Sequence, residues 1–172
     1  MSLVVLLGGA RSGKSQLALQ LAERAQAPVV FLATGEARDE EMADRIAHHR
    51  QERPASWATV EEPVELEQAV IGVDGTATLI VDCLSLWVSN LIERRPTPEI
   101  EAAAAAAAQV AAGRPGLTVA VSNEVGLGIV PLNALARSYR DVLGRVNALW
   151  VAAADEAYFV VAGQTIKLEE LT

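Results

Sequence analysis

The sequence predicts a single α/β domain, built on a mostly parallel sheet with helices on both of its faces. Short apolar runs recur along the chain and are separated by segments expected to be helical, as in a series of βα units. The apolar runs do not alternate with polar residues, which is typical of parallel strands covered on both faces. The length of 172 residues fits one domain, and no linker, repeat or strong break in composition divides residues 1–172.

The elements follow in order from these runs. Each apolar run is an expected strand, and parallel strands joined through helices imply right-handed crossovers. One helix contains a run of alanines, the best helix former, and ends at the glycines and proline of "AAGRPG". We expect strands at 3–7, 29–33, 78–81, 117–121 and 157–161, helices at 13–26, 39–53, 63–71, 83–94, 98–112 and 131–154, and a short edge strand at 165–168.

Composition limits the classes of partner. The formal net charge of −8 argues against nucleic acid, because a phosphate backbone requires a basic surface. The single cysteine, Cys83, excludes an internal disulfide and favours a reducing compartment. Two long apolar stretches are interrupted by Asp82 and by Asp155, and the apolar run at the N-terminus lacks the basic flank of a signal peptide. We therefore expect a cytoplasmic protein without a membrane span.

A glycine-rich loop between the first strand and the first helix is the strongest functional signal. It fits the pattern G-x-x-x-x-G-K-[ST], and the preceding strand and following helix are the context that this pattern requires. Backbone amides and the helix N-terminus would bind phosphate oxygens. Lys14 would reach the β- and γ-phosphates, and Ser15 would ligate Mg²⁺, so we predict a site for a nucleoside triphosphate. The loop residues are Gly8, Gly9, Ala10, Arg11, Ser12, Gly13, Lys14 and Ser15.

Polar residues end two further strands. Asp82 follows "TLIV", and a phosphate loop usually has such a carboxylate near its Mg²⁺. Acidic residues at strand ends are common, so the pairing with the loop is what favours a metal role. Asn123 and Glu124 follow another strand and precede a glycine-punctuated loop. A plain turn could use those glycines, but loops beyond strand ends form the ligand crevice of open α/β sheets, so we predict a substrate role for both residues.

Both histidines lie on the helix expected after the second strand. His49 continues the stripe of Met42, Ile46 and Arg53, whereas His48 lies about a hundred degrees away on the polar side. Two surface histidines are one interpretation of this spacing. A nucleophile is the other, since neutral imidazole attacks phosphorus well and has a pKa near neutrality.

Glu61 and Glu62 precede a helix expected to begin at Pro63. Proline in the first turn and acids near the helix dipole explain these residues without a site. The residues alone therefore assign them no chemical role.

Together these stretches resemble the bifunctional adenosylcobinamide kinase/adenosylcobinamide-phosphate guanylyltransferases of cobalamin biosynthesis. The glycine loop alone is generic, whereas "DEEMADRIAHHR" and "NEVGLGIVP" are far more specific to that family. The matching stretches span nearly the whole chain in the family's order. They are "GGARSGKS", "ATGEARDEEMADRIAHHRQERPASWATVEEP", "VDCLSLWVSNL", "VSNEVGLGIVPLNALARSYRDVLGRVNALWVAAADEAYFVVAG" and "IKL".

The resemblance implies a RecA-like P-loop fold, assembly as a homotrimer and two reactions. In the first, ATP or GTP phosphorylates the aminopropanol hydroxyl of adenosylcobinamide. In the second, GTP donates GMP to a histidine, pyrophosphate leaves, and adenosylcobinamide phosphate takes the GMP to give adenosylcobinamide-GDP. The guanylylated residue is implied to be His48, the first of the paired histidines. GTP contacts are implied for residues 8–15, Thr34, Gly35, Glu36, His49, Arg50, Gln51, Glu52, Asp82 and also Glu61, against the reading above.

Two other functions compete with this expectation. One is a P-loop kinase of another small metabolite, with both histidines on the surface, which a covalent adduct derived from GTP would exclude. The other is a nucleotide-dependent regulatory switch, which would show no turnover stimulated by cobinamide. Because His48 is well separated from the loop, we expect its helix to approach the nucleotide, through a hinge near Gly35.

Overall fold

The computed structural model describes residues 2–37, 40–51 and 53–169. Within 40–51, the side chains at positions 41, 42, 45, 48, 49 and 51 lie outside the described part.

A seven-stranded sheet forms the centre of the molecule, in the order β3-β2-β4-β5-β1-β6-β7. All neighbouring pairs from β3 to β6 are parallel, and β7 pairs antiparallel with β6. This arrangement confirms the predicted parallel sheet with an edge strand at its C-terminal end. The strands are β1 (Leu3–Gly8), β2 (Val29–Ala33), β3 (Ala58–Glu61), β4 (Thr78–Asp82), β5 (Thr118–Asn123), β6 (Glu156–Val161) and β7 (Gln164–Leu168).

The register of the sheet brings the carboxyl ends of four strands to one edge. Gly8 at the end of β1 pairs with Asn123 at the end of β5. Asp82 at the end of β4 lies between Ala33 of β2 and Val121 of β5. The residues predicted to bind phosphate, metal and substrate therefore share one edge of the sheet, where ligands bind in open α/β folds.

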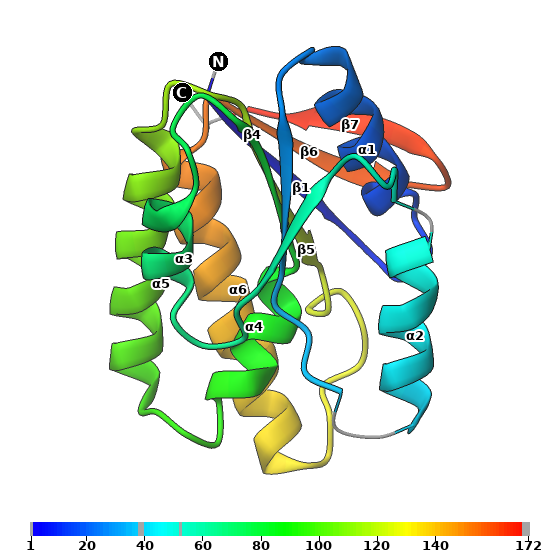
Figure 1. Cartoon of the computed structure of the whole chain (residues 1–172). Coiled ribbons are helices and arrows are strands. Elements are labelled where there is room, and N and C mark those ends of the chain that lie inside the picture. The colour runs from blue at the N-terminus through cyan, green and yellow to red at the C-terminus, as the bar shows by residue number, and fades with distance from the viewer. Residues whose placement is uncertain (1, 38–39, 52, 170–172) are drawn as a thin grey trace.

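Helices cover both faces of the sheet. Figure 1 shows α3, α4, α5 and α6 together on one face and α1 and α2 on the other. Such crossovers are what parallel strands require. The helices are α1 (Lys14–Arg24), α2 (Glu40–Gln51), α3 (Leu66–Gly72), α4 (Leu84–Leu91), α5 (Thr97–Ala112) and α6 (Ala134–Ala153).

The two faces bury apolar cores of different size. The larger core lies beneath the α3–α6 layer and includes the fully buried Trp87, Leu143 and Trp150. The smaller core lies on the other face, where Ala18 and Ala22 of α1 meet residues of the sheet. Because each large buried apolar side chain contributes about 1.5–3 kcal/mol, the α3–α6 layer supplies most of the stability.

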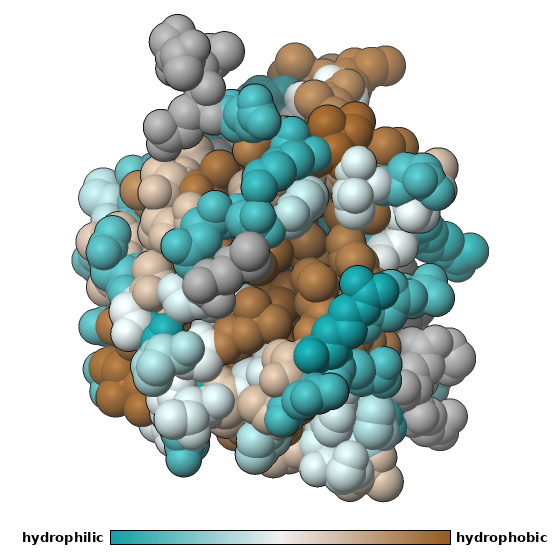
Figure 2. Space-filling view, turned by 90° about the horizontal axis from the view of Figure 1, so that it is seen from above, coloured by the Kyte–Doolittle hydropathy of each residue, from teal (hydrophilic) through white to brown (hydrophobic). Residues whose placement is uncertain are grey.

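Apolar side chains also remain on the surface, as expected for a chain that is 51% hydrophobic. Figure 2 shows an apolar area between hydrophilic side chains on the face seen from above. The loop before α6 carries the most exposed apolar residues, since Leu127, Ile129 and Leu132 are 80%, 98% and 100% exposed. Across the described ranges, no helix combines the length and the apolar character that a bilayer crossing would demand.

Helix α6 begins at Ala134 rather than at 131, after the capping Asn133, and α4 ends at Leu91 rather than at 94. Two further differences from the predicted elements concern the site. Strand β3 was not predicted, because three of its four residues are exposed and it lacks an apolar run. Helix α3 begins at Leu66 rather than at Pro63, since the Glu62 carboxylate first accepts hydrogen bonds from the amides of Val64 and Glu65, both at 2.9 Å. These two differences together place Glu61 at the end of a strand instead of at a helix entrance.

Candidate nucleotide and phosphoryl-transfer site

The predicted phosphate loop follows β1 and leads directly into α1. The packing and backbone conformation of this loop explain why two of its positions are glycine. A Cβ on Gly8 would lie 2.2 Å from the carbonyl oxygen of Val160, and Gly13 has a φ of 103°, which favours glycine. The loop is fixed from both sides, because the Glu124 amide donates to the Gly8 carbonyl (3.0 Å) and the Gly163 amide donates to the Ser12 carbonyl (2.9 Å).

Lys14 is the first residue of α1, and its side chain folds back over the loop. Its ammonium donates hydrogen bonds to the carbonyls of Gly8 (2.9 Å) and Gly9 (2.7 Å) and to Ser12 Oγ (3.3 Å). Burial lowers the pKa of Lys14, while the nearby Cys83 and Asp82 act in the opposite direction. The Lys14 ammonium is thus positioned inside the loop, as a phosphate-binding lysine must be.

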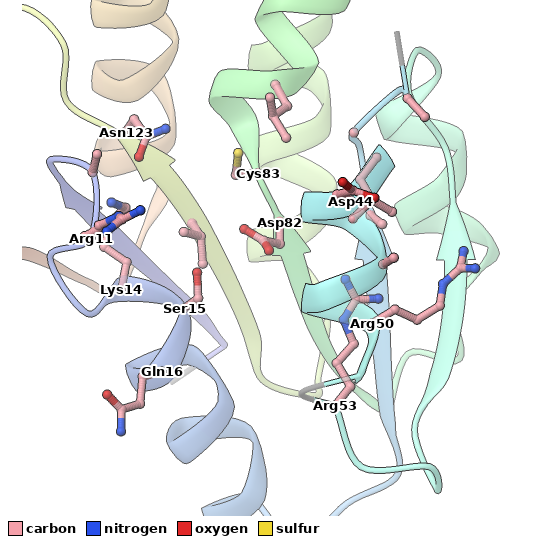
Figure 3. Close-up of a pocket in the computed structure, with 18 of the residues that line it drawn as sticks. Arg11, Lys14, Ser15, Gln16, Asp44, Arg50, Arg53, Asp82, Cys83 and Asn123 are labelled. Atoms are coloured by element: carbon pink, nitrogen blue, oxygen red, sulfur yellow. The ribbon is translucent and has the colours of Figure 1, made fainter. Parts of the chain in front are cut away.

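A cleft of about 1100 Å³ opens beside this loop, between α1 and α2. Its volume lies just above the range of about 300–1,000 Å³ that is usual for small-ligand sites. Figure 3 shows side chains from both walls, with Ser15 on α1 and Asp82 at the end of β4. The lining residues are Ala10, Arg11, Ser12, Gly13, Lys14, Ser15, Gln16, Ala33, Gly35, Ala37, Ala43, Asp44, Ile46, Ala47, Arg50, Arg53, Glu61, Asp82, Cys83, Leu86, Val121 and Asn123.

Ser15 and Asp82 supply the donor set that was predicted for a metal ion. Both line the cleft, so a hydroxyl and a carboxylate lie beside the phosphate loop. Mg²⁺ prefers oxygen ligands and is commonly held by one or two protein groups together with phosphate oxygens and water. The two side chains therefore fit Mg²⁺ bound with a nucleotide. Groups of three or more His, Cys, Asp or Glu side chains suited to a metal are absent from the described ranges.

Thr34 and Cys83 join the ends of β2 and β4. The Thr34 hydroxyl accepts from the Cys83 amide (2.9 Å) and donates to the Cys83 carbonyl (2.7 Å), and the Asn90 amide group donates to the Thr34 carbonyl (2.7 Å). Thr34 is fully buried and is absent from the residues that line the cleft. Burial also raises the pKa of Cys83 to about 11, so its thiol stays protonated and is a poor nucleophile.

The segment from β2 to α2 is shaped by Gly35 and Glu36. A Cβ on Gly35 would lie 3.3 Å from Leu86 and 3.5 Å from Ile46, so glycine lets α2 approach α4 closely. Glu36 accepts a bidentate pair of hydrogen bonds from Arg94, both at 2.9 Å. Gly35 lines the cleft, whereas Glu36 is held towards the end of α4.

Helix α2 forms the second wall of the cleft. The described side chains of Ala43, Asp44, Ile46, Ala47 and Arg50 all line it. Arg50 also forms an ion pair with Glu61 at the end of β3, and this pair places both of these predicted nucleotide contacts at the cleft.

The predicted nucleophile belongs to the same helix. The backbone of His48 lies in α2. The side chains of His48, His49 and Gln51, and the whole of Glu52, lie outside the described residues.

Asn123 and Glu124 have different surroundings. Asn123 lines the cleft and donates a hydrogen bond to Ser85 Oγ (3.0 Å). The Glu124 carboxylate accepts from the Gly126 amide, and Glu124 is absent from the cleft lining. Of the two predicted substrate residues, only Asn123 reaches the cleft.

Arg53 is a cleft residue to which the sequence analysis gave no role. Its guanidinium carbon lies 3.4 Å from the centroid of the Phe31 ring. The available signal was its place on the predicted stripe that includes Met42 and Ile46, although Arg53 itself lies after the end of α2.

Comparison with known proteins gives a family match over most of the chain. The family model for cobinamide kinase / cobinamide phosphate guanyltransferase, CobU, matches residues 4–168. The bifunctional adenosylcobalamin biosynthesis protein CobP of Pseudomonas aeruginosa is 40% identical, over 96% of this chain and 96% of its own. The bifunctional adenosylcobalamin biosynthesis protein CobU of Escherichia coli K12 is 36% identical, over 97% of this chain and 99% of its own.

Solved structures of low sequence identity support the fold alone. The flagellar accessory protein FlaH of Methanocaldococcus jannaschii has a TM-score of 0.50 at 13% identity, over 95% of this chain and 74% of its own. An ATPase of a bacterial type III secretion system has a TM-score of 0.53 at 12% identity, over 96% of this chain and 56% of its own. This chain therefore shares an α/β fold with both of these proteins. From the family model and the two relatives, this chain belongs to the cobinamide kinase / cobinamide phosphate guanyltransferase family.

Proposed function

We propose that this chain phosphorylates adenosylcobinamide with ATP or GTP and then transfers GMP from GTP to adenosylcobinamide phosphate. The observation that carries this proposal is one cleft with two kinds of wall. The phosphate loop, Ser15 and Asp82 line one side, and the helix that contains His48 forms the other. The family name and the names of both relatives agree with a bifunctional enzyme.

In the kinase step, the loop holds the triphosphate while the hydroxyl of the corrinoid side arm attacks the γ-phosphorus. The bond between the γ-phosphorus and its bridging oxygen breaks, the nucleoside diphosphate leaves with the electron pair, and the hydroxyl proton passes to solvent. The Lys14 ammonium, together with the loop amides, offsets the charge on the β- and γ-oxygens. Ser15 and Asp82 would hold Mg²⁺, which supplies further charge neutralisation when it is bound. The chain's own contribution is mainly the position of these groups.

In the transferase step, an imidazole nitrogen of His48 attacks the α-phosphorus of GTP. A nitrogen–phosphorus bond forms, the bond between the α-phosphorus and the bridging oxygen breaks, and pyrophosphate leaves with the electron pair. The phosphate group of the corrinoid then attacks the same phosphorus and releases the imidazole. Two displacements replace one difficult transfer. We infer that α2 moves towards the nucleotide about the segment near Gly35.

The other predicted GTP contacts differ in where their side chains lie relative to the cleft. Glu61 and Arg50 line the cleft and would contact the nucleotide once their ion pair opens. Gly35 lets α2 approach, and Thr34 would act indirectly by fixing the end of β4. Glu36, His49, Gln51 and Glu52 stay predicted GTP contacts.

The corrinoid would lie at the mouth of the cleft, beside Asn123, with Glu124 at the root of the exposed loop. That loop exposes Leu127, Ile129 and Leu132, which is more apolar surface than scattered single residues provide. We propose that this surface becomes covered, either by the substrate or in the homotrimer that the family resemblance implies. The proposed compartment is the cytoplasm, where the nucleoside triphosphates are available.

The purified protein tests this function when it is incubated with cobinamide, Mg²⁺ and either ATP or GTP. We expect cobinamide phosphate with one of the two nucleotides, and cobinamide-GDP with release of pyrophosphate only when GTP is present. Corrinoid phosphorylation without any nucleotidyl product would support a kinase alone. Slow hydrolysis that cobinamide does not stimulate would support a regulatory switch.

A further inference from the structure

We propose that Arg53 is a further cation for the triphosphate, binding the β- and γ-phosphates from the α2 side of the cleft while Lys14 binds them from the loop. The inference rests on the proposed function for the identity of the nucleotide, and its experiment needs no corrinoid.

The position of Arg53 is set by an aromatic ring. Its guanidinium carbon lies 3.4 Å from the centroid of Phe31, a buried residue of β2. Arginine stacks on aromatic faces through the plane of the guanidinium. Stacking therefore restrains the face of the group and leaves its N–H edge available for an acceptor. Figure 3 shows the Arg53 side chain extending into the cleft towards β4.

The charge of Arg53 lacks a close counter-ion in the described part of the chain, where no carboxylate lies within 4.0 Å of its guanidinium nitrogens. Five other arginines each have such a partner, namely Arg50, Arg94, Arg95, Arg140 and Arg145. Arg53 is nonetheless partly buried, and burial lowers its pKa below the ordinary value. A partly buried cation of this kind is stabilised when an anion binds next to it.

The location of Arg53 favours a phosphate as that anion. Arg53, Lys14 and Asp82 line the same cleft, and the Asp82 charge acts on both cations. Figure 3 shows Asp82 between the α1 wall and Arg53. A triphosphate on the loop would bring several negative charges to this point, and the planar fork of arginine matches two phosphate oxygens.

Binding of two guanine nucleotides tests the proposal. Calorimetry with Mg²⁺ would compare GMP with the α,β-methylene analogue of GTP, which cannot transfer GMP. In Arg53→Met, we expect the Kd of the triphosphate analogue to rise about 10- to 100-fold, as for loss of a charge-assisted contact, with the Kd of GMP unchanged. Arg53→Lys should recover part of the loss. Arg24→Met, at the exposed end of α1, is the matched control and should change neither Kd.

Three outcomes would overturn the inference. The first is an unchanged Kd for the triphosphate analogue in Arg53→Met. The second is an equal loss of affinity for GMP and for the analogue, which would place Arg53 at the base or ribose. The third is an affinity for the analogue in Arg53→Lys that is no higher than in Arg53→Met. If Arg53→Met does not fold, Arg53→Lys and Phe31→Leu serve as the test. Each should raise the Kd of the triphosphate analogue and leave the Kd of GMP unchanged. A wild-type protein that forms the GMP adduct but shows no dependence on Arg53 would remove only this inference. A dependence on Arg53 without corrinoid turnover would remove only the proposed function.

Discussion

The two helices that form the walls of the cleft are held in different ways. Helix α1 buries Ala18 and Ala22 against the sheet, and its first residue, Lys14, is hydrogen-bonded to the phosphate loop. In α2, the described Ala43, Asp44, Ala47 and Arg50 are exposed, and Ile46 is only half-buried. Few buried apolar contacts are the mark of a segment that opens at low free-energy cost.

On the proposed function, this difference separates holding the nucleotide from reacting with it. The wall proposed to bind phosphate is packed against the sheet. We propose that the wall that contains His48, whose described side chains are exposed or half-buried, adjusts its position to the α-phosphorus. A family with two reactions in one cleft needs both properties, and the predictions below test them from the largest expected effect to the smallest.

The strongest effect should come from the fixed wall. Lys14→Ala removes the ammonium that would offset charge on the triphosphate, so we expect both reactions to slow by about 100-fold or more. Steady-state corrinoid phosphorylation and the rate of GMP adduct formation measure the two reactions separately. Lys167→Ala is the matched control, because Lys167 is the other lysine of the chain and pairs with Glu156 on the β6–β7 hairpin. Full kinase turnover in Lys14→Ala would contradict a shared site.

Asp82→Asn tests the metal role at the end of β4. An amide is a weaker Mg²⁺ ligand than a carboxylate. The Mg²⁺ concentration that gives half-maximal activity should therefore rise by about 10-fold or more. The measurement is a Mg²⁺ titration of kinase activity at saturating nucleotide. A titration identical to that of the wild type would remove Asp82 from the metal site.

A matched pair of substitutions tests how the two walls are packed. Ala18→Leu inserts three carbon atoms where α1 has no space, since Ala18 is 1% exposed, and should lower the free energy of unfolding by about 1–3 kcal/mol. Ala47→Leu, at an exposed position on the side of α2 that faces the cleft, should change it by less than about 0.5 kcal/mol. Urea unfolding measures both. Equal losses in the two variants would mean that α2 is as firmly packed as α1.

The smallest effect should come from the ion pair between Glu36 and Arg94. The pair is bidentate but partly open to solvent, so Arg94→Gln should lower the free energy of unfolding by at most about 1 kcal/mol, and by less at high salt. Hydrogen exchange in α2 should nevertheless become faster, because the pair ties the segment before α2 to the end of α4. Unchanged exchange in α2 would show that this ion pair does not restrain the helix.

Most of the fold, and the part of the site that surrounds the phosphate loop, could be predicted from the sequence. Apolar runs gave the parallel strands, because burial on both faces leaves a strong compositional signal. Strand β3 gives no such signal, since it lies at the sheet edge with exposed residues, and Glu61 was therefore first assigned to a helix entrance. The phosphate loop was predicted because its function requires fixed residue types at fixed spacing.

The rest of the site depends on contacts between distant segments. Arg53 stacks on Phe31 across 22 positions of sequence, and no local pattern marks such a pair. The Thr34 hydroxyl is bonded to the backbone of Cys83, which gives it a structural task that its place after β2 does not reveal. Residues of the loop could be predicted from its motif and Arg50 on the opposite wall from the family resemblance, whereas the role of Arg53 required the fold.

The central claim is that one cleft serves two reactions and that His48 on α2 carries the second. Mass spectrometry of the purified protein after incubation with GTP and Mg²⁺ tests it most directly. The account predicts a mass increase equal to one GMP, mapped to the peptide that contains His48. His49→Ala should keep this adduct, and His48→Ala should lose it while corrinoid phosphorylation stays measurable. An adduct that persists in His48→Ala, or no adduct in the wild type, would contradict the account.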